Sequence, residues 1–183
     1  MDKNMQRKHG IHMRKSLPEA ELYSRHICDR LLSSPHYKRA KVILTYSPFN
    51  GEADVSFFNS RAQSDGKTLA YPICESDGIM VAAIPESDSA WETGKYGIKT
   101  PIRKSARILN PEEIDLVIVP CTAFAPESRM RLGMGAGYYD RYLPKCKNAQ
   151  SVAVAYEVQK TSDLVAGEWD IPLDAVLTET TWY

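Results

Sequence analysis

The chain has 183 residues, of which 43% are hydrophobic and 25% charged, and this is enough apolar material for one compact domain. Its 23 basic and 23 acidic side chains cancel, so no overall positive field favours nucleic acid or an anionic membrane. Residues 1–25 carry charge throughout, and no apolar run reaches the roughly 18 residues that span a bilayer. The four cysteines lie far apart without metal-ligand spacing, which is typical of a reducing compartment. We therefore expect a single cytoplasmic domain over residues 1–183 that binds neither nucleic acid nor membrane.

Two helices are predicted at the start of the chain. Residues 2–15 form a basic helix that Gly10 should weaken. The segment Ser16-Leu17-Pro18-Glu19 has the form of a capping box, in which serine and glutamate side chains satisfy free amides at a helix start. Apolar residues at helical spacing then predict an amphipathic helix that ends near Ser33-Ser34-Pro35.

Short apolar segments rich in β-forming residues predict the strands. They are residues 41–46, 68–73, 79–84, 115–120, 151–156 and 175–180. Between them we expect a helix from Asp54 to about Ala62, a loop over 85–106, a short helical start at 110–113, and a helix from Tyr138 to about Lys145. Strands that alternate with helices favour an α/β class. We expect a single-domain three-layer α/β/α sandwich with a largely parallel or mixed sheet.

A glycine-rich segment carries the clearest functional motif. Residues 131–140 read Arg-Leu-Gly-Met-Gly-Ala-Gly-Tyr-Tyr-Asp, with glycines at alternate positions directly before a predicted helix. Glycines let backbone amides face an anion, the helix amino terminus adds a positive dipole end, and Arg131 can offer a forked donor to phosphate. The chain lacks the Gly-Lys-Ser/Thr of a Walker A loop, and Tyr138 stands where a dinucleotide fingerprint needs glycine. A simple turn between strand and helix is the alternative.

The longer string RLGMGAGYYDRYL resembles the signature of the 5-formyltetrahydrofolate cyclo-ligases, also called methenyltetrahydrofolate synthetases. Three more segments resemble that family in the same order: DKNMQRKHGIHMRKSL, YSPFNGEADV and EWDIPLDAVLTE. The resemblance covers nearly the whole chain. It implies an ATP- and Mg²⁺-dependent ligase that converts 5-formyltetrahydrofolate to 5,10-methenyltetrahydrofolate and releases ADP and phosphate.

The resemblance implies an ATP site between the basic helix and the glycine loop. Its residues are Lys3, Arg7, Arg131, Leu132, Gly133, Met134, Gly135, Ala136, Gly137, Tyr138 and Tyr139. Lys3 and Arg131 are also expected to act in catalysis. Lys3, Arg7 and Arg14 lie within about 40° of one another on one helix face, which by pattern alone is also typical of a solvated basic face. The resemblance places phosphate against the first two and leaves Arg14 undecided. Many family members carry Lys or Gly in place of Ala136, where alanine would disfavour a positive φ.

The resemblance also implies a folate site and a metal site. The folate is expected at Ser47, Glu52, Met134, Gly135, Ala136, Gly137 and Tyr138, with Ser47 the weaker match. A carboxylate suits the pterin, whose adjacent N–H groups can bind both oxygens, although a turn carboxylate is often only solvated. The magnesium ligands match Asp140 and Asp170, with Asp174 as a nearby alternative. Two carboxylates suffice when phosphate and water complete the Mg²⁺ shell.

Two other functions stay open. One is a nucleotide- or folate-binding relative without turnover. The other is a phosphosugar or thioester-transfer enzyme on a similar scaffold, because fold does not fix function. The sequence shows no Cys–His or Ser–His pattern for a side-chain nucleophile, and the family's reaction needs none. We expect ATP and 5-formyltetrahydrofolate as small-molecule partners and a monomer or weak homodimer.

Overall fold

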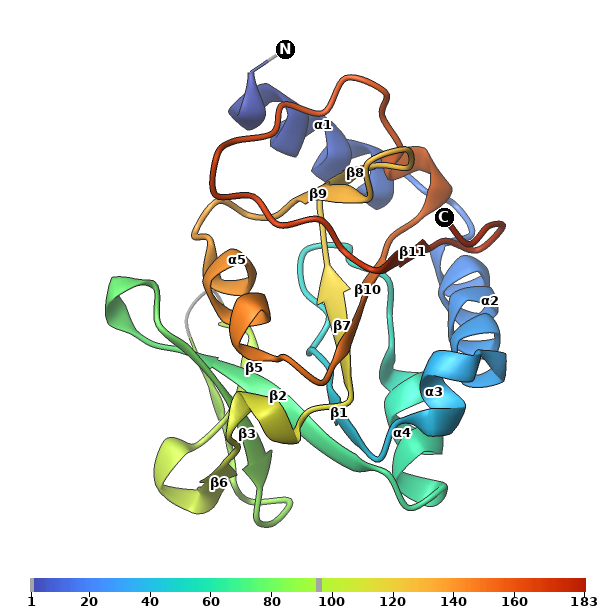
Figure 1. Ribbon diagram of the computed structural model, residues 1–183. Coiled ribbons are helices and arrows are strands. Elements are labelled where there is room, and N and C mark those ends of the chain that lie inside the picture. Colours follow the sequence, from blue (N-terminus) through green and yellow to red (C-terminus); the bar gives the residue numbers. More distant parts are fainter. Residues whose placement is uncertain (1, 95–96) are drawn as a thin grey trace.

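The computed structural model describes residues 2–94 and 97–183, and its centre is a seven-stranded sheet in the order β11-β10-β7-β1-β2-β3-β6 (Figure 1). The strands of this sheet are β1 (Val42–Leu44), β2 (Thr68–Cys74), β3 (Met80–Pro85), β6 (Ala106–Ile108), β7 (Leu116–Pro120), β10 (Gln150–Val154) and β11 (Ala175–Leu177). From β11 to β2 all neighbours are parallel, and β3 and β6 add an antiparallel edge. The predicted α/β class with a mixed sheet is confirmed.

Helices cover both faces of the sheet. The α-helices in the described residues are α1 (Lys3–Lys15), α2 (Ala20–Ser33), α3 (Pro35–Arg39), α4 (Ser56–Ser64) and α5 (Tyr138–Tyr142), of which all but α1 lie on a sheet face. Helices α2, α3 and α4 pack on one face, and α5 with the 3-10 helix Leu143–Lys145 packs on the other (Figure 1). Successive strand residues serve opposite faces: Ile43 and Ile118 contact the first layer, and Leu44 and Val119 the second. None of the helices in the described ranges is both long and apolar enough to cross a membrane.

Helix α1 lies across the carboxyl ends of the parallel strands instead of on a sheet face (Figure 1). It contacts β8 (Ala123–Ala125), which follows β7, and the 3-10 helix Glu157–Gln159, which follows β10. Gly10 permits this approach, because a Cβ at that position would lie 1.9 Å from the carbonyl oxygen of Thr122. The glycine predicted to weaken the helix is therefore the point at which the helix docks.

The predicted capping box at residues 16–19 is wrong. Ser16 is the C-cap that follows the last residue of α1, and its hydroxyl donates to the carbonyl of His12 at 2.9 Å. Glu19, which precedes α2, makes no capping hydrogen bond through its side chain. A capping box does form at Asn110 and Glu113, where the short helical start was predicted.

The predicted loop over 85–106 is also wrong in part. It contains a hairpin of β4 (Trp91–Thr93) and β5 (Lys99–Pro101), while residues 95–96 lie outside the described part of the chain. The Trp91 ring contacts the Tyr71 ring edge-on at a centroid distance of 4.7 Å, which anchors the hairpin to β2. A second unpredicted hairpin pairs β8 with β9 (Met130–Leu132) and leads into the glycine loop.

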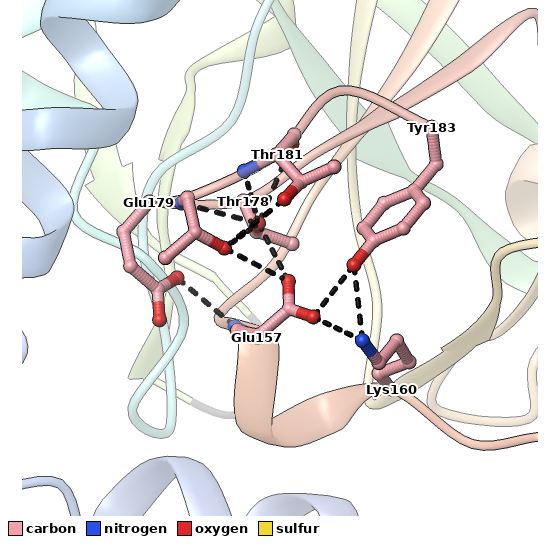
Figure 2. A network of polar contacts seen from close by, with 7 residues as sticks. Glu157, Lys160, Thr178, Glu179, Thr181 and Tyr183 are labelled. Atoms are coloured by element: carbon pink, nitrogen blue, oxygen red, sulfur yellow. Dashed lines mark hydrogen bonds and ion pairs between the residues drawn. The ribbon is translucent and has the colours of Figure 1, made fainter.

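The last strand is shorter than the predicted 175–180, because the residues after Leu177 enter a polar network (Figure 2). The Glu157 carboxylate accepts hydrogen bonds from Thr178 at 2.8 Å and Tyr183 at 2.6 Å, and it also binds Lys160. The Glu157 amide donates to the Glu179 carboxylate at 2.9 Å. The network fastens the C-terminal segment to the 3-10 helix that supports α1.

We predict that Gly10→Ala destabilises the fold although alanine is the better helix former. Alanine gains about 1 kcal/mol in helix propensity, whereas overpacking against the Thr122 carbonyl costs about 3 kcal/mol. Urea unfolding should show a net loss of about 2 kcal/mol in the free energy of unfolding. Lys8→Ala on the exposed face of α1 is the control and should leave stability nearly unchanged. A Gly10→Ala variant as stable as wild type would contradict the docking role.

Candidate functional site

The glycine loop joins β9 to α5 at the carboxyl edge of the sheet. Gly135 has φ +102° and Gly137, which precedes the first turn of α5, has φ +67°. Ala136 is not among the residues with positive φ, so alanine fits this backbone. Met134, Gly135 and Ala136 are exposed, and the loop therefore presents its backbone to solvent.

Two side chains brace this loop: Arg141, which the sequence did not single out, and Tyr138, which was predicted as an ATP and folate contact. Arg141 binds the carbonyl of Ala136 and donates to the Gly78 carbonyl at 3.0 Å. The Tyr138 hydroxyl donates to the Glu75 carbonyl at 3.0 Å. Both contacts tie the loop to the turn between β2 and β3. The available signal for Arg141 was its position one helical turn after Gly137.

The amino-terminal half of α1 faces the loop from above. Lys3 Nζ lies 2.6 Å from Asp170 Oδ2, and Arg7 Nε donates to the Gly133 carbonyl at 3.0 Å. Burial disfavours the charged form of Asp170, but hydrogen bonds from Lys3 and the Gly167 amide outweigh burial and lower its pKa. The predicted pair of cations thus reaches the predicted loop and the predicted acid.

Segment 163–170 lies along α1 because a glutamine holds it there. Gln6 is buried, and its side chain donates to the Asp163 carbonyl and accepts from the Val165 amide at 3.0 Å. Nothing in the sequence pattern identified Gln6, since it looked like one more polar residue of a solvated helix.

Arg131 joins the glycine loop to the Asp170 turn. Its buried guanidinium donates to Asp140 Oδ1 at 3.0 Å and to the Ile171 carbonyl at 3.0 Å. The Ile171 amide donates to the same Asp140 oxygen at 3.2 Å. The two predicted metal ligands are therefore brought to one region although 30 residues separate them in the chain.

The two carboxylates leave room for a further ligand. Within the described residues, the hydrogen bonds of Asp140 involve Oδ1 and those of Asp170 involve Oδ2. No group of three or more His, Cys, Asp or Glu side chains in those residues could hold a metal by itself. A hydrated Mg²⁺ that also binds phosphate fits such a pair. Asp174 is engaged elsewhere, because it accepts from the Ser151 amide at 2.7 Å and hydroxyl at 2.8 Å.

Glu52 lies in the turn after β1, against the other end of α1. Its Oε2 accepts from the Phe49 amide at 3.0 Å, and its Oε1 lies 3.7 Å from Arg14 Nη2. The side chain is only 10% exposed. Burial raises the pKa of Glu52 to about 7, although Arg14 and the Phe49 amide favour the charged form. The carboxyl therefore titrates near neutral pH.

Arg14, which the sequence left undecided, belongs to this end of the site. Its guanidinium is fully buried and donates to the Cys121 carbonyl at 2.9 Å and the Asn50 carbonyl at 3.0 Å. Gln159 donates to the same Cys121 carbonyl at 2.8 Å. The helix that carries Lys3 and Arg7 thus also holds the Glu52 turn.

Ser47 is not brought into these contacts. Its hydroxyl donates to the Lys99 carbonyl at 2.8 Å and so faces β5.

A separate cavity of about 650 Å³ lies between α2, α3 and the C-terminal residues. None of the predicted site residues lines that cavity.

Comparison with known proteins places the chain among enzymes of one kind. A family model described as the 5-formyltetrahydrofolate cyclo-ligase family matches residues 4–179. The 5-formyltetrahydrofolate cyclo-ligase of Escherichia coli (strain K12) is 30% identical over 153 residues, which are 81% of this chain and 84% of that protein.

Two solved structures share the fold over nearly the whole chain. The NMR structure of the Aquifex aeolicus 5,10-methenyltetrahydrofolate synthetase is 33% identical and has a TM-score of 0.85, with 100% of this chain and 92% of that chain covered. A 5,10-methenyltetrahydrofolate synthetase from Mycoplasma pneumoniae is 28% identical and has a TM-score of 0.80, with 98% and 99% covered. The chain belongs to the 5-formyltetrahydrofolate cyclo-ligase family.

Proposed function

We propose that the protein uses ATP to convert 5-formyltetrahydrofolate to 5,10-methenyltetrahydrofolate, with release of ADP and phosphate. One observation carries the proposal beyond family membership. A single helix, α1, contacts the glycine loop through Arg7 and the Glu52 turn through Arg14. Groups suited to a phosphate chain and a group suited to a pterin are thereby held by one element at one edge of the sheet.

The phosphates of ATP would lie between the glycine loop and α1. Several features support this: Gly133, Gly135 and Gly137 place no side chain of their own over the loop backbone, and α5 begins at the end of the loop. Lys3 and Arg7 add positive charge on the facing side. The resemblance assigns six further residues to ATP. They are Met134 and Ala136, which are exposed, and Leu132, Arg131, Tyr138 and Tyr139.

The pterin of the folate would bind Glu52. Its Oε1 is oriented by the turn but is not hydrogen-bonded within the described residues, so this oxygen can accept from a ring N–H. The glycine-loop residues 134–138 would contact the same substrate from the other side, where the formyl group meets the γ-phosphate. Ser47 stays a weaker assignment, because its hydroxyl already binds the Lys99 carbonyl.

The reaction needs positioning and charge more than a nucleophilic side chain. The formyl oxygen attacks the γ-phosphorus of ATP, the bond to ADP breaks, and an imidate phosphate forms. The nitrogen at position 10 then attacks the formyl carbon and loses its proton, and the carbon–oxygen bond breaks as phosphate leaves. Lys3 and Arg131 would stabilise the charge on the transferred phosphoryl group. Phosphorylation is required because a formyl amide oxygen is a poor leaving group.

Asp140 and Asp170 would hold a Mg²⁺ ion together with phosphate oxygens and water. Bound there, the ion would neutralise phosphate charge. Arg131 and Lys3 hold one oxygen of each carboxylate in place, so the second oxygen of each is oriented before metal arrives. These contacts support both acids as ligands and set Asp174 apart from them.

The decisive experiment is incubation of the purified protein with ATP, Mg²⁺ and 5-formyltetrahydrofolate. The conjugated methenyl product should appear in the near ultraviolet, with one ADP released per product. A folate- or nucleotide-binding relative without turnover would bind substrate and give no product. A transferase acting on phosphosugars or thioesters would show neither folate binding nor folate-dependent ATP hydrolysis.

Glu52→Gln should raise the KM for folate by about tenfold while the KM for ATP stays within about twofold, because one acceptor oxygen becomes a donor.

The same variant should also change how the free energy of unfolding depends on pH. Glu52 keeps its proton in the folded state above its unfolded pKa of 4.5, so wild type loses stability as pH rises from there to about 7. The free energy of unfolding of Glu52→Gln, relative to that of wild type, should therefore increase by about 2 kcal/mol between about pH 5 and pH 8. Equal pH dependence of both proteins in urea unfolding would exclude a raised Glu52 pKa.

Asp140→Asn and Asp170→Asn should each raise the Mg²⁺ concentration needed for half-maximal rate, by about tenfold, since each keeps an oxygen but loses a charge. Excess Mg²⁺ should restore part of the rate. The double variant should lose less than the sum of both, because the two acids serve one ion. Asp174→Asn is the control: it weakens the bond to Ser151 but should leave the Mg²⁺ requirement unchanged. A metal effect at Asp174 instead of Asp170 would refute the assignment.

A further inference from the structure

We propose that Arg14 is a positioning residue of the folate site that fixes both the place and the charge state of Glu52. The inference rests on the proposed role of Glu52 as the pterin ligand. Lys3, Arg7 and Arg14 share one face of α1, and the inference gives a function to Arg14, whose contacts are with neither the glycine loop nor Asp170.

The guanidinium of Arg14 joins three segments of the chain. It donates to the Asn50 carbonyl at 3.0 Å and the Phe49 carbonyl at 3.4 Å in the Glu52 turn, and to the Cys121 carbonyl at 2.9 Å after β7. The side chain has no exposed surface. Its rigid fork of donors reaches all three carbonyls at once, which the point charge of a lysine could not do.

Backbone carbonyls accept these hydrogen bonds but carry no formal charge. Among the described residues, Glu52 is the acid that forms an ion pair with Arg14, at 3.7 Å. A buried cation without an acid partner is costly, and so is a buried carboxylate without a cation. The two side chains therefore compensate for each other's burial, and the charge of Glu52 depends on Arg14.

The other titratable groups near Glu52 are neutral where it titrates. They are the phenols of Tyr46 at the end of β1 and Tyr139 on α5, and the thiol of Cys121 after β7. Burial is the main cause that raises the pKa of each of them, and the charge of Glu52 adds to it. Arg14 is thus the charged neighbour, and the Phe49 amide the uncharged donor, that oppose the effect of burial on Glu52.

Loss of Arg14 would affect the two substrates differently. The pKa of Glu52 would rise further, so that a neutral carboxylic acid would meet the pterin N–H donors at neutral pH. The turn would also lose its anchors at Phe49 and Asn50. Lys3 and Arg7 bind Asp170 and Gly133, which Arg14 does not touch, so ATP binding would change little.

Three variants test the inference. Arg14→Met removes the charge, Arg14→Lys keeps the charge and loses the fork, and Gln159→Met removes a bond to the same Cys121 carbonyl without changing charge near Glu52. Two measurements are made on each: the titration of the Glu52 carboxyl by ¹³C NMR, assigned with Glu52→Gln, and the KM values for folate and ATP across pH.

In Arg14→Met the midpoint of the Glu52 carboxyl titration should rise by about one pH unit or more. The folate KM at neutral pH should rise by about tenfold. Its pH profile for folate KM should shift upward with the midpoint, and its ATP KM should stay within about twofold. Arg14→Lys should keep a midpoint close to wild type and raise the folate KM about threefold through loss of the fork. Gln159→Met should leave the midpoint unchanged.

An unchanged Glu52 midpoint in Arg14→Met, or an equal rise in both KM values, would overturn the proposal. If Arg14→Met does not fold, Arg14→Lys decides: a wild-type folate KM overturns the proposal, and a raised folate KM with a retained midpoint supports it. The NMR titration needs no substrate. Absence of ligase activity in wild type would therefore refute the proposed function, whereas the link between Arg14 and the Glu52 charge would stand or fall by its own measurement.

Discussion

The close contact between Gly10 and the Thr122 carbonyl sets how near α1 lies to the strand ends, and therefore which parts of the site its side chains reach. Glycine in a helix interior costs about 1 kcal/mol relative to alanine, and here it lets α1 touch the backbone that follows β7. At one end of α1, Lys3 then reaches Asp170 and Arg7 reaches the glycine loop, and near the other end Arg14 reaches the Glu52 turn. If a larger side chain at position 10 moved α1 away from this backbone, the contacts at both ends of the helix would be lost.

The site holds two acids in opposite electrostatic states. Asp170 binds Lys3 directly and has a lowered pKa, whereas Glu52 lies 3.7 Å from its cation and has a raised one. These states suit different partners: a charged carboxylate suits a metal ion, and a carboxyl that titrates near neutrality can respond to the donors of a bound ring. A buried carboxyl of this kind lowers stability at neutral pH, so its presence is better explained by binding than by folding.

Features that depend on neighbouring residues could be predicted from the sequence, and those that depend on distant ones could not. The apolar run closed by Pro120 became β7, and the alternating glycines became an open loop before a helix. Ser16 and Glu19 have the residue types of a capping box at the start of a helix, but Ser16 caps the end of α1 instead. The local sequence is compatible with both arrangements. The β4–β5 hairpin depends on a ring contact with Tyr71 on a different strand. The function of Arg14 likewise depends on carbonyls 35 and 107 residues away.

The chemistry explains why one helix should serve both substrates. A formyl oxygen and a γ-phosphorus react only when they are held close together and aligned, and an error of about 1 Å can cost about a hundredfold in rate. Two independent loops would let the substrates move separately, but a helix hydrogen-bonded from Lys3 to Lys15 moves as one body. The turn with Glu52 and the loop with Gly133 are fastened to that body at its two ends. With pterin and phosphate bound as proposed, the distance between them would be set by how α1 docks on the strand ends. The packing at Gly10 would then contribute to the catalytic geometry without Gly10 contacting either substrate.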